Sequence, residues 1–203
     1  MKRTLALLSA ILLCLSANAG GKEFLRRLHP GLEWGYSLTA ATFRHFNYLD
    51  PSIGFRINEK GWSSMAQSNA YVLASVGYNI NDRLMLSLLS GYQGIDRGIR
   101  SVPILARADY YLSGMDTDGF YVFSDIGVNL GRPNSLGNQM QVGSGYSFYM
   151  APHCSVAVVI GARAVYDRPD IWDPVEEAYI PKHNIKRNDA WYCAFNMGIN
   201  LKF

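Results

Sequence analysis

The sequence has 203 residues, of which 49% are hydrophobic and 17% are charged, and its formal net charge is +3. So small a positive charge excludes an electrostatic case for nucleic-acid binding, and the length fits a single domain. The 13 tyrosines outnumber the 9 phenylalanines. Tyrosine suits positions where the ring lies in apolar surroundings while the hydroxyl contacts water.

Residues 1–19 have the pattern of a secretory signal peptide. Lys2 and Arg3 precede an apolar run from Leu5 to Leu15, and an Ala-Asn-Ala sequence closes the segment as a cleavage site would. Removing these two cations from the charge of +3 leaves +1 for the mature chain. Beyond the signal, no stretch approaches the roughly 18 to 20 continuous apolar residues that a membrane helix needs. A mature chain that spans a membrane is therefore expected to do so as a closed sheet.

Residues 20–31 are expected to form a periplasmic leader. They contain a basic amphipathic stretch, Lys22–His29, and this stretch ends at Pro30 and Gly31. The main interpretation is a leader into the first strand, and a turn of interfacial helix is the alternative.

The rest of the chain alternates apolar and polar side chains at the period of two that β-strands require. The predicted strands are Leu32–Ala41, Asn69–Tyr78, Arg83–Tyr92, Ile99–Leu112, Phe120–Leu130, Gln139–Met150, Ser155–Tyr166 and Ala190–Phe203. Two cysteines of the mature chain, Cys154 and Cys193, fall near opposite ends of this pattern, about 30 Å apart by strand rise, and are expected to stay unpaired.

Short turns alternate with longer intervals between these strands, and two intervals, 43–68 and 167–189, are long enough to be outer loops. An even strand number with this asymmetry is typical of membrane barrels. The sequence predicts an all-β, eight-stranded antiparallel up-and-down transmembrane β-barrel over residues 32–203. A soluble eight-stranded barrel is the alternative fold, but its polar face would have to coat the outside. Here that face is rich in small residues and suits a narrow lumen.

Ala190–Phe203 places bulky apolar side chains on one face and ends on Phe203. This resembles the terminal strand of bacterial outer-membrane β-barrels, a likeness that implies recognition by the assembly machinery. The residues it assigns to that signal are Phe195, Met197, Ile199, Leu201 and Phe203.

The segment Ser101–Leu130 is a strand led by proline and ending in paired tyrosines, a turn, and a strand with an Asp-x-Gly sequence. It resembles small outer-membrane β-barrel proteins common in Bacteroidetes. The resemblance implies location in the outer membrane of a Gram-negative bacterium, in contact with lipid and lipopolysaccharide, and it implies no particular activity.

Several charged residues fall on the lumen face: Glu33, Arg107, Asp109, Asp125 and Arg163. Buried charges must pair, and the hairpin of the fourth and fifth strands brings Arg107 close to Asp125. The main interpretation is a salt-bridged network that fills the interior, and a narrow small-solute pore is the alternative.

The interval 43–68 contains residues that would suit a rim enzyme acting on lipid A or phospholipid. His45 could serve as base, Asp50 as orienting carboxylate, and Ser63 or Ser64 as nucleophile. However, the His-x-Ser-Asn sequence of barrel esterases is absent, because Phe and Asn follow His45. Catalysis is therefore the second interpretation.

The interval 167–189 could offer oxygen ligands to a cation such as calcium, from Asp167, Asp170, Asp173, Glu176 and Glu177. Their spacing matches no calcium-loop pattern, so a solvated loop of mixed charge is the main interpretation. Lys182, Lys186 and Arg187 follow, and could contact lipopolysaccharide phosphates. No motif for zinc, nucleotide or haem is present, and no cofactor is expected.

The sequence thus predicts a monomeric or weakly associating outer-membrane barrel. Its expected role is structural or adhesion-like and is carried by the two long outer loops.

Overall fold

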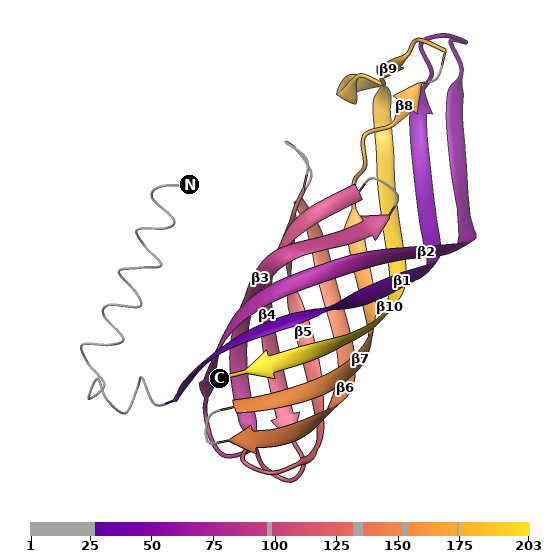
Figure 1. The fold of residues 1–203 in the computed structure, drawn as a ribbon. Helices are drawn as coiled ribbons and strands as arrows, with labels where there is room; N and C mark the ends of the chain where they lie inside the picture. The colour runs from indigo at the N-terminus through magenta and orange to yellow at the C-terminus, as the bar shows by residue number, and fades with distance from the viewer. Residues whose placement is uncertain (1–26, 97–98, 132–135, 152–153, 174) are drawn as a thin grey trace, which may run out of the picture.

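A computed structural model describes residues 27–96, 99–131, 136–151, 154–173 and 175–203. Within these residues, eight antiparallel strands close into a barrel in the order β1-β10-β7-β6-β5-β4-β3-β2 (Figure 1). This confirms the predicted fold class. The barrel strands are β1 (Leu28–Leu49), β2 (Arg56–Asn79), β3 (Leu84–Asp96), β4 (Ile99–Tyr111), β5 (Gly119–Leu130), β6 (Leu136–Ala151), β7 (Cys154–Asp167) and β10 (Ile185–Lys202).

Two very short strands, β8 (Trp172–Asp173) and β9 (Ala178–Tyr179), form a separate hairpin between β7 and β10, and the 3-10 helix η1 (Lys182–Asn184) follows. None of the helices among the described residues has the length and apolar character that a bilayer crossing needs.

The first and last barrel strands, β1 and β10, pair along most of their length, and this pairing closes the ring. Gly31 lies opposite Lys202, and the Phe203 N–H donates a 2.8 Å hydrogen bond to the Pro30 carbonyl. Leu28–Gly31 therefore belong to β1 and not to the leader, because their backbone pairs with β2 and β10. The expected signal peptide, 1–19, and leader residues 20–26 lie outside the described residues.

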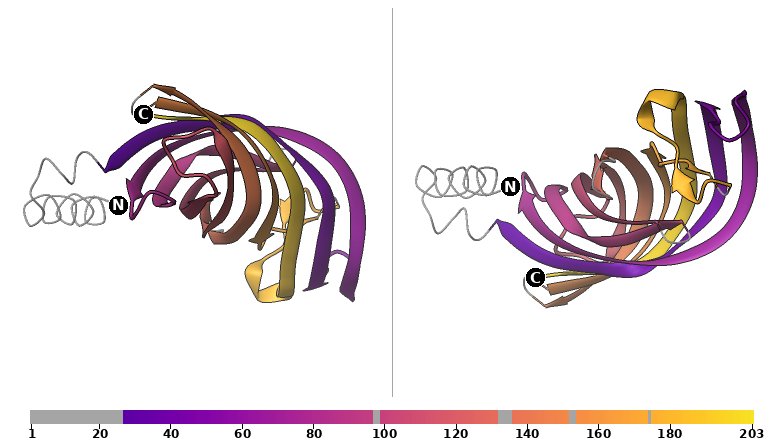
Figure 2. Two further views of the ribbon diagram at one scale, coloured as in Figure 1. Left: turned by 90° about the horizontal axis from the view of Figure 1, so that it is seen from below. Right: turned by 90° about the horizontal axis from the view of Figure 1, so that it is seen from above.

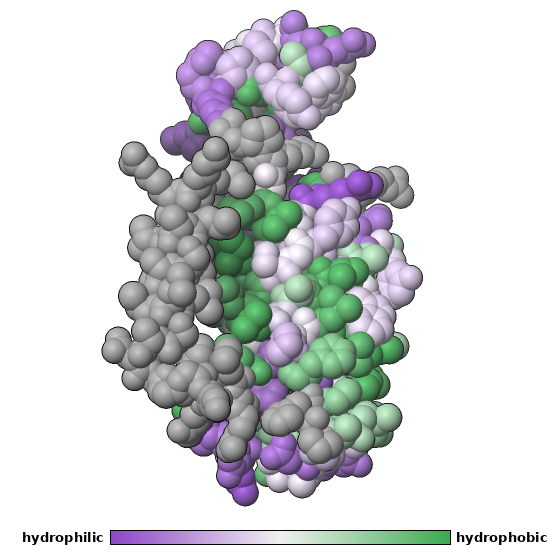
Figure 3. All heavy atoms as spheres, turned by 60° about the vertical axis from the view of Figure 1, so that its left-hand side comes forward, coloured by the Kyte–Doolittle hydropathy of each residue, from purple (hydrophilic) through white to green (hydrophobic). Residues whose placement is uncertain are grey.

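The two faces of the barrel wall differ as the alternation requires. On the outside, Ile126 is 69% exposed and Met197 is 68% exposed. Asp125, the neighbour of Ile126 in β5, points into the lumen and is 2% exposed. Figure 3 shows the outward side chains as a hydrophobic band with hydrophilic residues at the lower end. This polarity is the reverse of the soluble barrel considered as an alternative, so apolar surroundings must cover the wall.

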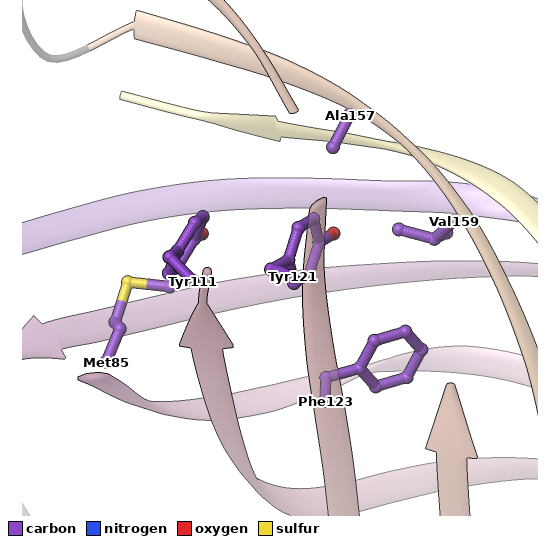
Figure 4. Close-up of a cluster of buried hydrophobic side chains, with 6 residues drawn as sticks. All are labelled: Met85, Tyr111, Tyr121, Phe123, Ala157 and Val159. Carbon is purple, nitrogen blue, oxygen red and sulfur yellow. The ribbon is translucent and has the colours of Figure 1, made fainter. Parts of the chain in front are cut away.

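Side chains fill the barrel from one end to the other. Near the end of the barrel where β1 begins and β10 ends, called the termini end below, Tyr111, Tyr121 and Phe123 point inward with three smaller apolar side chains (Figure 4). The rings of Tyr111 and Tyr121 stack at 5.0 Å between centroids. Two further apolar clusters lie along the lumen: Tyr71, Leu73, Leu89 and Leu105, and then Ile95, Val165, Ala190 and Tyr192. Polar layers separate these clusters.

Three strands continue beyond the barrel at the end opposite the termini. β1, β2 and β10 run past the neighbouring strands as a sheet, which we call the extension (Figures 1 and 2). Its hairpin turns at Asp50–Phe55, where the Gly54 N–H bonds to the Asp50 carbonyl and Gly54 has a φ of 69°. The prediction of a loop over residues 43–68 was therefore wrong, because β1 and β2 occupy most of this interval. The predicted loop 167–189 likewise gives its last part to β10.

A β-bulge marks the start of the extension. Ala40 is skipped in the register between Thr39 and Ala41 against both β10 and β2. A bulge bends a strand and increases its twist. The three strands change direction near this level in Figure 1.

Candidate functional site

The centre of the lumen is an arginine held by two carboxylates. Arg107 on β4 bonds to Asp125 on β5 through Nε at 2.7 Å and Nη2 at 2.9 Å, and its Nη1 pairs with Glu33 on β1. Glu33 also accepts a 2.9 Å hydrogen bond from Asn200. The guanidinium carbon lies 4.4 Å from the centre of the Phe123 ring. Every guanidinium nitrogen of Arg107 thus has a carboxylate partner, which favours a structural role.

A second ion pair lies nearer the termini. The Lys202 ammonium bonds to Asp109 at 2.9 Å and to the Tyr111 hydroxyl at 2.6 Å. The sequence pattern alone assigns no role to Lys202. Its pairing depends on which strands meet when the barrel closes, and no local pattern carries that information.

Arg163 lies in a third polar layer, near the start of the extension. It donates to Gln93 at 2.8 Å, to Ser37 at 2.7 Å and to the Gly94 carbonyl at 3.1 Å. Gln93 in turn bonds to Asn129 at 2.6 Å and to Gln139 at 2.5 Å. The partners of Arg163 are thus a side-chain amide, a hydroxyl and a backbone carbonyl. Across the lumen, the charges still balance, since Arg107, Lys202 and Arg163 match Glu33, Asp109 and Asp125.

The cavities at the two ends of the lumen are small. The one at the termini end, beside Met85 and Tyr111, holds about 40 Å³, and the one at the opposite end, beside Ile95 and Asn129, holds about 20 Å³. A single water needs about 10 to 15 Å³ of such volume. Together with the buried layers, these volumes describe a plugged interior.

The rim residues considered for catalysis are spread along the extension hairpin. His45 Nε2 lies 3.3 Å from Asn58 Oδ1, and Asp50 accepts a 2.6 Å bond from the Ser52 hydroxyl. Ser63 donates at 3.4 Å to the Thr42 carbonyl, and Ser64 lies opposite Ala41.

No hydrogen bond among the described residues joins His45 to Asp50, Ser63 or Ser64. Ser63 faces Thr42, three residues from His45, so the two are about 10 Å apart along the strands. They also point to opposite faces of the sheet. The extended hairpin therefore separates residues that a compact loop would have gathered.

The acidic residues considered for a cation each serve local structure or stand apart. Asp173 Oδ1 accepts the Val175 N–H at 2.9 Å, and Asp167 accepts the Arg168 N–H at 2.8 Å. The Glu176 N–H also bonds to Asp173 Oδ1, at 3.4 Å, and the described residues contain no group of three or more His, Cys, Asp and Glu able to hold a metal. Cys154 and Cys193 are both free.

The face considered as an assembly signal points outward along β10. Phe195 is 63% exposed, Met197 68%, and Phe203, beside the chain end, 50%. Ile199 and Leu201 lie on the same face by strand alternation.

One edge of the extension has no neighbouring strand. The ladder between β2 and β3 begins at Tyr71 opposite Gln93, whereas β2 pairs with β1 along its whole length from Arg56. Arg56–Ala70 is therefore hydrogen-bonded on one side only, within the described residues. Its other side offers unpaired backbone N–H and C=O groups.

An aromatic row crosses the outer face at the base of the extension. Tyr166, Trp191, Phe43 and Trp62 lie opposite one another on β7, β10, β1 and β2. The ring centroids of Tyr166 and Trp191 are 5.1 Å apart, and those of Phe43 and Trp62 are 5.2 Å apart. Such rows form where an apolar wall meets a polar layer.

Solved structures with a similar fold are outer-membrane proteins. The crystal structure of OprG from Pseudomonas aeruginosa matches 86% of this chain and 95% of its own, at 12% identity and a TM-score of 0.50. Neisserial surface protein A matches 87% and 97%, at 16% identity and a TM-score of 0.41. AlkL in lipid bilayers matches 85% and 90%, at 10% identity and a TM-score of 0.40.

No family model matches the sequence, and no curated protein matches it. The likeness to OprG shows that the chain has the fold of the outer-membrane β-barrels. The comparisons give no support to the narrower resemblance to barrels common in Bacteroidetes.

Proposed function

We propose that this protein is an outer-membrane β-barrel that acts as a surface-interaction protein, with its extension as the binding element. The outward apolar band supports placement in a bilayer, because contact between so large an apolar surface and water is unfavourable. The fold supports the outer membrane, and the end of the barrel where β1 begins and β10 ends then faces the periplasm. The extension projects outside the cell.

The observation that carries the proposal is the open edge of β2 from Arg56 to Ala70. An extended polypeptide can add a strand to such an edge, where main-chain hydrogen bonds give affinity and alternate side chains give selectivity. Large apolar side chains stand close to the edge, with Phe55 74% exposed and Trp62 67% exposed. We therefore infer that the partner is a protein segment that binds in an extended conformation.

The other functions suggested by the sequence draw less support from the geometry. A small-solute pore needs a continuous passage, whereas the lumen is filled by buried ion pairs and stacked rings. A rim enzyme needs its base beside its nucleophile, whereas His45 and Ser63 lie on opposite faces.

The test uses the mature chain refolded into lipid nanodiscs and random dodecapeptides displayed on phage. A shortened variant has residues 45–60 replaced by Asn-Gly after the Arg44–Gly61 pair, which keeps the barrel and the aromatic row. We expect selected peptides to bind the intact chain, to bind more weakly to the shortened variant, which lacks Arg56–Lys60 of the edge, and to protect β2 amides from hydrogen exchange. Equal binding to both forms would refute the proposal.

A proline scan over Asn58, Glu59 and Lys60 sharpens the test. Successive strand residues direct their N–H groups to alternate sides, so some of these prolines remove an edge donor and others a donor to β1. Variants of the first kind should keep the barrel's resistance to unfolding by heat and lose peptide binding. Binding that is insensitive to every proline would argue against strand addition.

A further inference from the structure

The outward face of the extension is polar immediately above the aromatic row. Two residues after Phe43 on the same face of β1, His45 lies between Lys60 of β2 and Asp189 of β10. Two residues further along this face, Asn47 lies between Asn58 and Arg187. Arg56 continues the face, with its Nη1 bonded to Asn47 Oδ1 at 2.9 Å.

This face carries more cations than acids. Asp189 pairs with Arg187 and lies 3.7 Å from Arg168, and it also accepts a 2.7 Å hydrogen bond from the Tyr166 hydroxyl. The Asp189 side chain is only 13% exposed, whereas Arg168 and Arg187 are 68% and 57% exposed. One sequestered carboxylate thus orients two arginines whose charged groups remain open to an anion.

Lys60 and Arg56 add two more cations to the face without an ion pair among the described residues. The opposite face of the sheet differs, because Glu59 alternates with Lys60 and Arg44 is paired with Asp96 at 3.5 Å. The positive charge therefore gathers on the one face that continues the outer wall of the barrel.

An open apolar groove lies below this face on the same wall. It holds about 660 Å³ and runs between Ile126 and Met140 on one side and Tyr166 and Trp191 on the other, with Ala164 between them. The small Ala164 side chain leaves room that larger residues would fill. Tyr166 and Trp191 belong to both the groove and the aromatic row, so the groove and the basic face are continuous.

We propose that this face and groove bind a phosphorylated glycolipid of the outer leaflet. Arg168 and Arg187 would hold a phosphate with Lys60 and Arg56 nearby, while an acyl chain lies in the groove over Ala164. Charge complementarity selects this occupant, since phosphates are the anions present at the head-group level and arginine binds them through several N–H groups. The site rests on the membrane placement proposed above and is separate from the β2 edge.

The test titrates the mature chain in detergent micelles with bis-phosphorylated lipid A, followed by native mass spectrometry. A second titration uses the same lipid without its phosphates. We expect the phosphorylated lipid to bind more tightly. The variant Lys60→Gln with Arg187→Gln should weaken its binding by roughly 25-fold, since each surface cation contributes on the order of fivefold. Ala164→Phe should weaken both lipids together.

The matched control is Arg44→Gln with Arg83→Gln, which removes the same charge from the opposite face and from a turn at the other end. It should bind lipid A within about twofold of the unaltered chain. Equal loss in the control and the test variant, or no preference for the phosphorylated lipid, would overturn the proposal. Displacement by inorganic phosphate at equal phosphate concentration would assign the face to a free anion and overturn the lipid assignment.

Insertion is measured first, in lipid vesicles, by tryptophan fluorescence and by resistance to heat. A chain that fails to insert overturns the membrane placement and this site with it. An inserted chain without phosphate preference overturns the lipid site alone.

Discussion

Arg107 and Asp125 face each other directly across the β4–β5 ladder, and two nitrogens of the guanidinium bond to the two carboxylate oxygens at 2.7 and 2.9 Å. This pair holds the centre of the lumen network, because Arg107 also binds Glu33 from the first strand.

Arg107→Leu should therefore destabilise the barrel strongly. It would leave Glu33 and Asp125 buried without their cation, at a cost of about 3 to 5 kcal/mol. Urea unfolding in lipid vesicles measures this. Adding Glu33→Gln and Asp125→Asn to the same chain removes the stranded charges and should recover most of the loss. A triple variant no more stable than Arg107→Leu would contradict this account.

The plugged interior predicts little conductance. Planar-bilayer recording of the unaltered chain should show no large, steady current. Tyr121→Ala removes a fully buried ring between Tyr111 and Phe123, so it should destabilise the barrel by about 3 kcal/mol or more and raise leakage. Tyr110→Ala is the control, because Tyr110 is 44% exposed on the outside. Steady current through the unaltered chain would show that the plug opens.

Phe203→Ser should reduce assembly into the outer membrane several-fold and leave the chemistry of the extension unchanged. The side chain is 50% exposed on the outward face, while its N–H fixes the chain end to Pro30. Phe203→Leu keeps an apolar side chain and should assemble better than the serine variant. Quantifying the heat-resistant barrel in membrane fractions checks both. Normal assembly of Phe203→Ser would remove the residue from the recognition signal.

The tip of the extension should respond to acid through Asp50. Hydrogen bonds from the Ser52 hydroxyl and backbone hold the pKa of the Asp50 carboxyl below its ordinary value. A lowered pKa means that the ionised carboxylate stabilises the folded turn above its ordinary pKa, and that this stabilisation is lost as the pH falls through the lowered value.

Ser52→Ala should raise the Asp50 pKa toward the ordinary value, so the turn loses order at a higher pH than in the unaltered chain. Titration of the Asp50 carboxyl carbon by NMR measures the shift. An unchanged pKa would mean that the Ser52 hydroxyl does not hold the carboxylate in solution.

The barrel could be predicted from the sequence because each wall strand keeps one parity of apolar residues. The extension could not. In β1 the bulge at Ala40 changes the outward residues from even-numbered, as at Leu38, to odd-numbered, as at Phe43, so the apolar alternation in the sequence breaks there. In β2 the outward residues Ser64 and Ser68 are small, and those beyond Trp62, such as Lys60, are polar, so the region gives no alternating apolar signal.

The same division holds for the lumen. Arg107 and Asp125 are joined by one hairpin, so local register brings them together. Lys202 and Asp109 come from strands that are not neighbours, and Arg163 on β7 bonds to Gln93 on β3 and Ser37 on β1. Such pairs depend on how the ring closes, which a linear pattern does not contain.

The origins of the groups around Arg107 also set an order of events in assembly. Asp125 can reach Arg107 within the β4–β5 hairpin, long before the ring is complete. Glu33 and Asn200 come from the first and last strands, which meet only at the seam. Asp125 thus balances the arginine charge early, whereas the Glu33 carboxylate gains its cation only at the final step, so an unfinished sheet in lipid carries an electrostatic penalty that only closure removes.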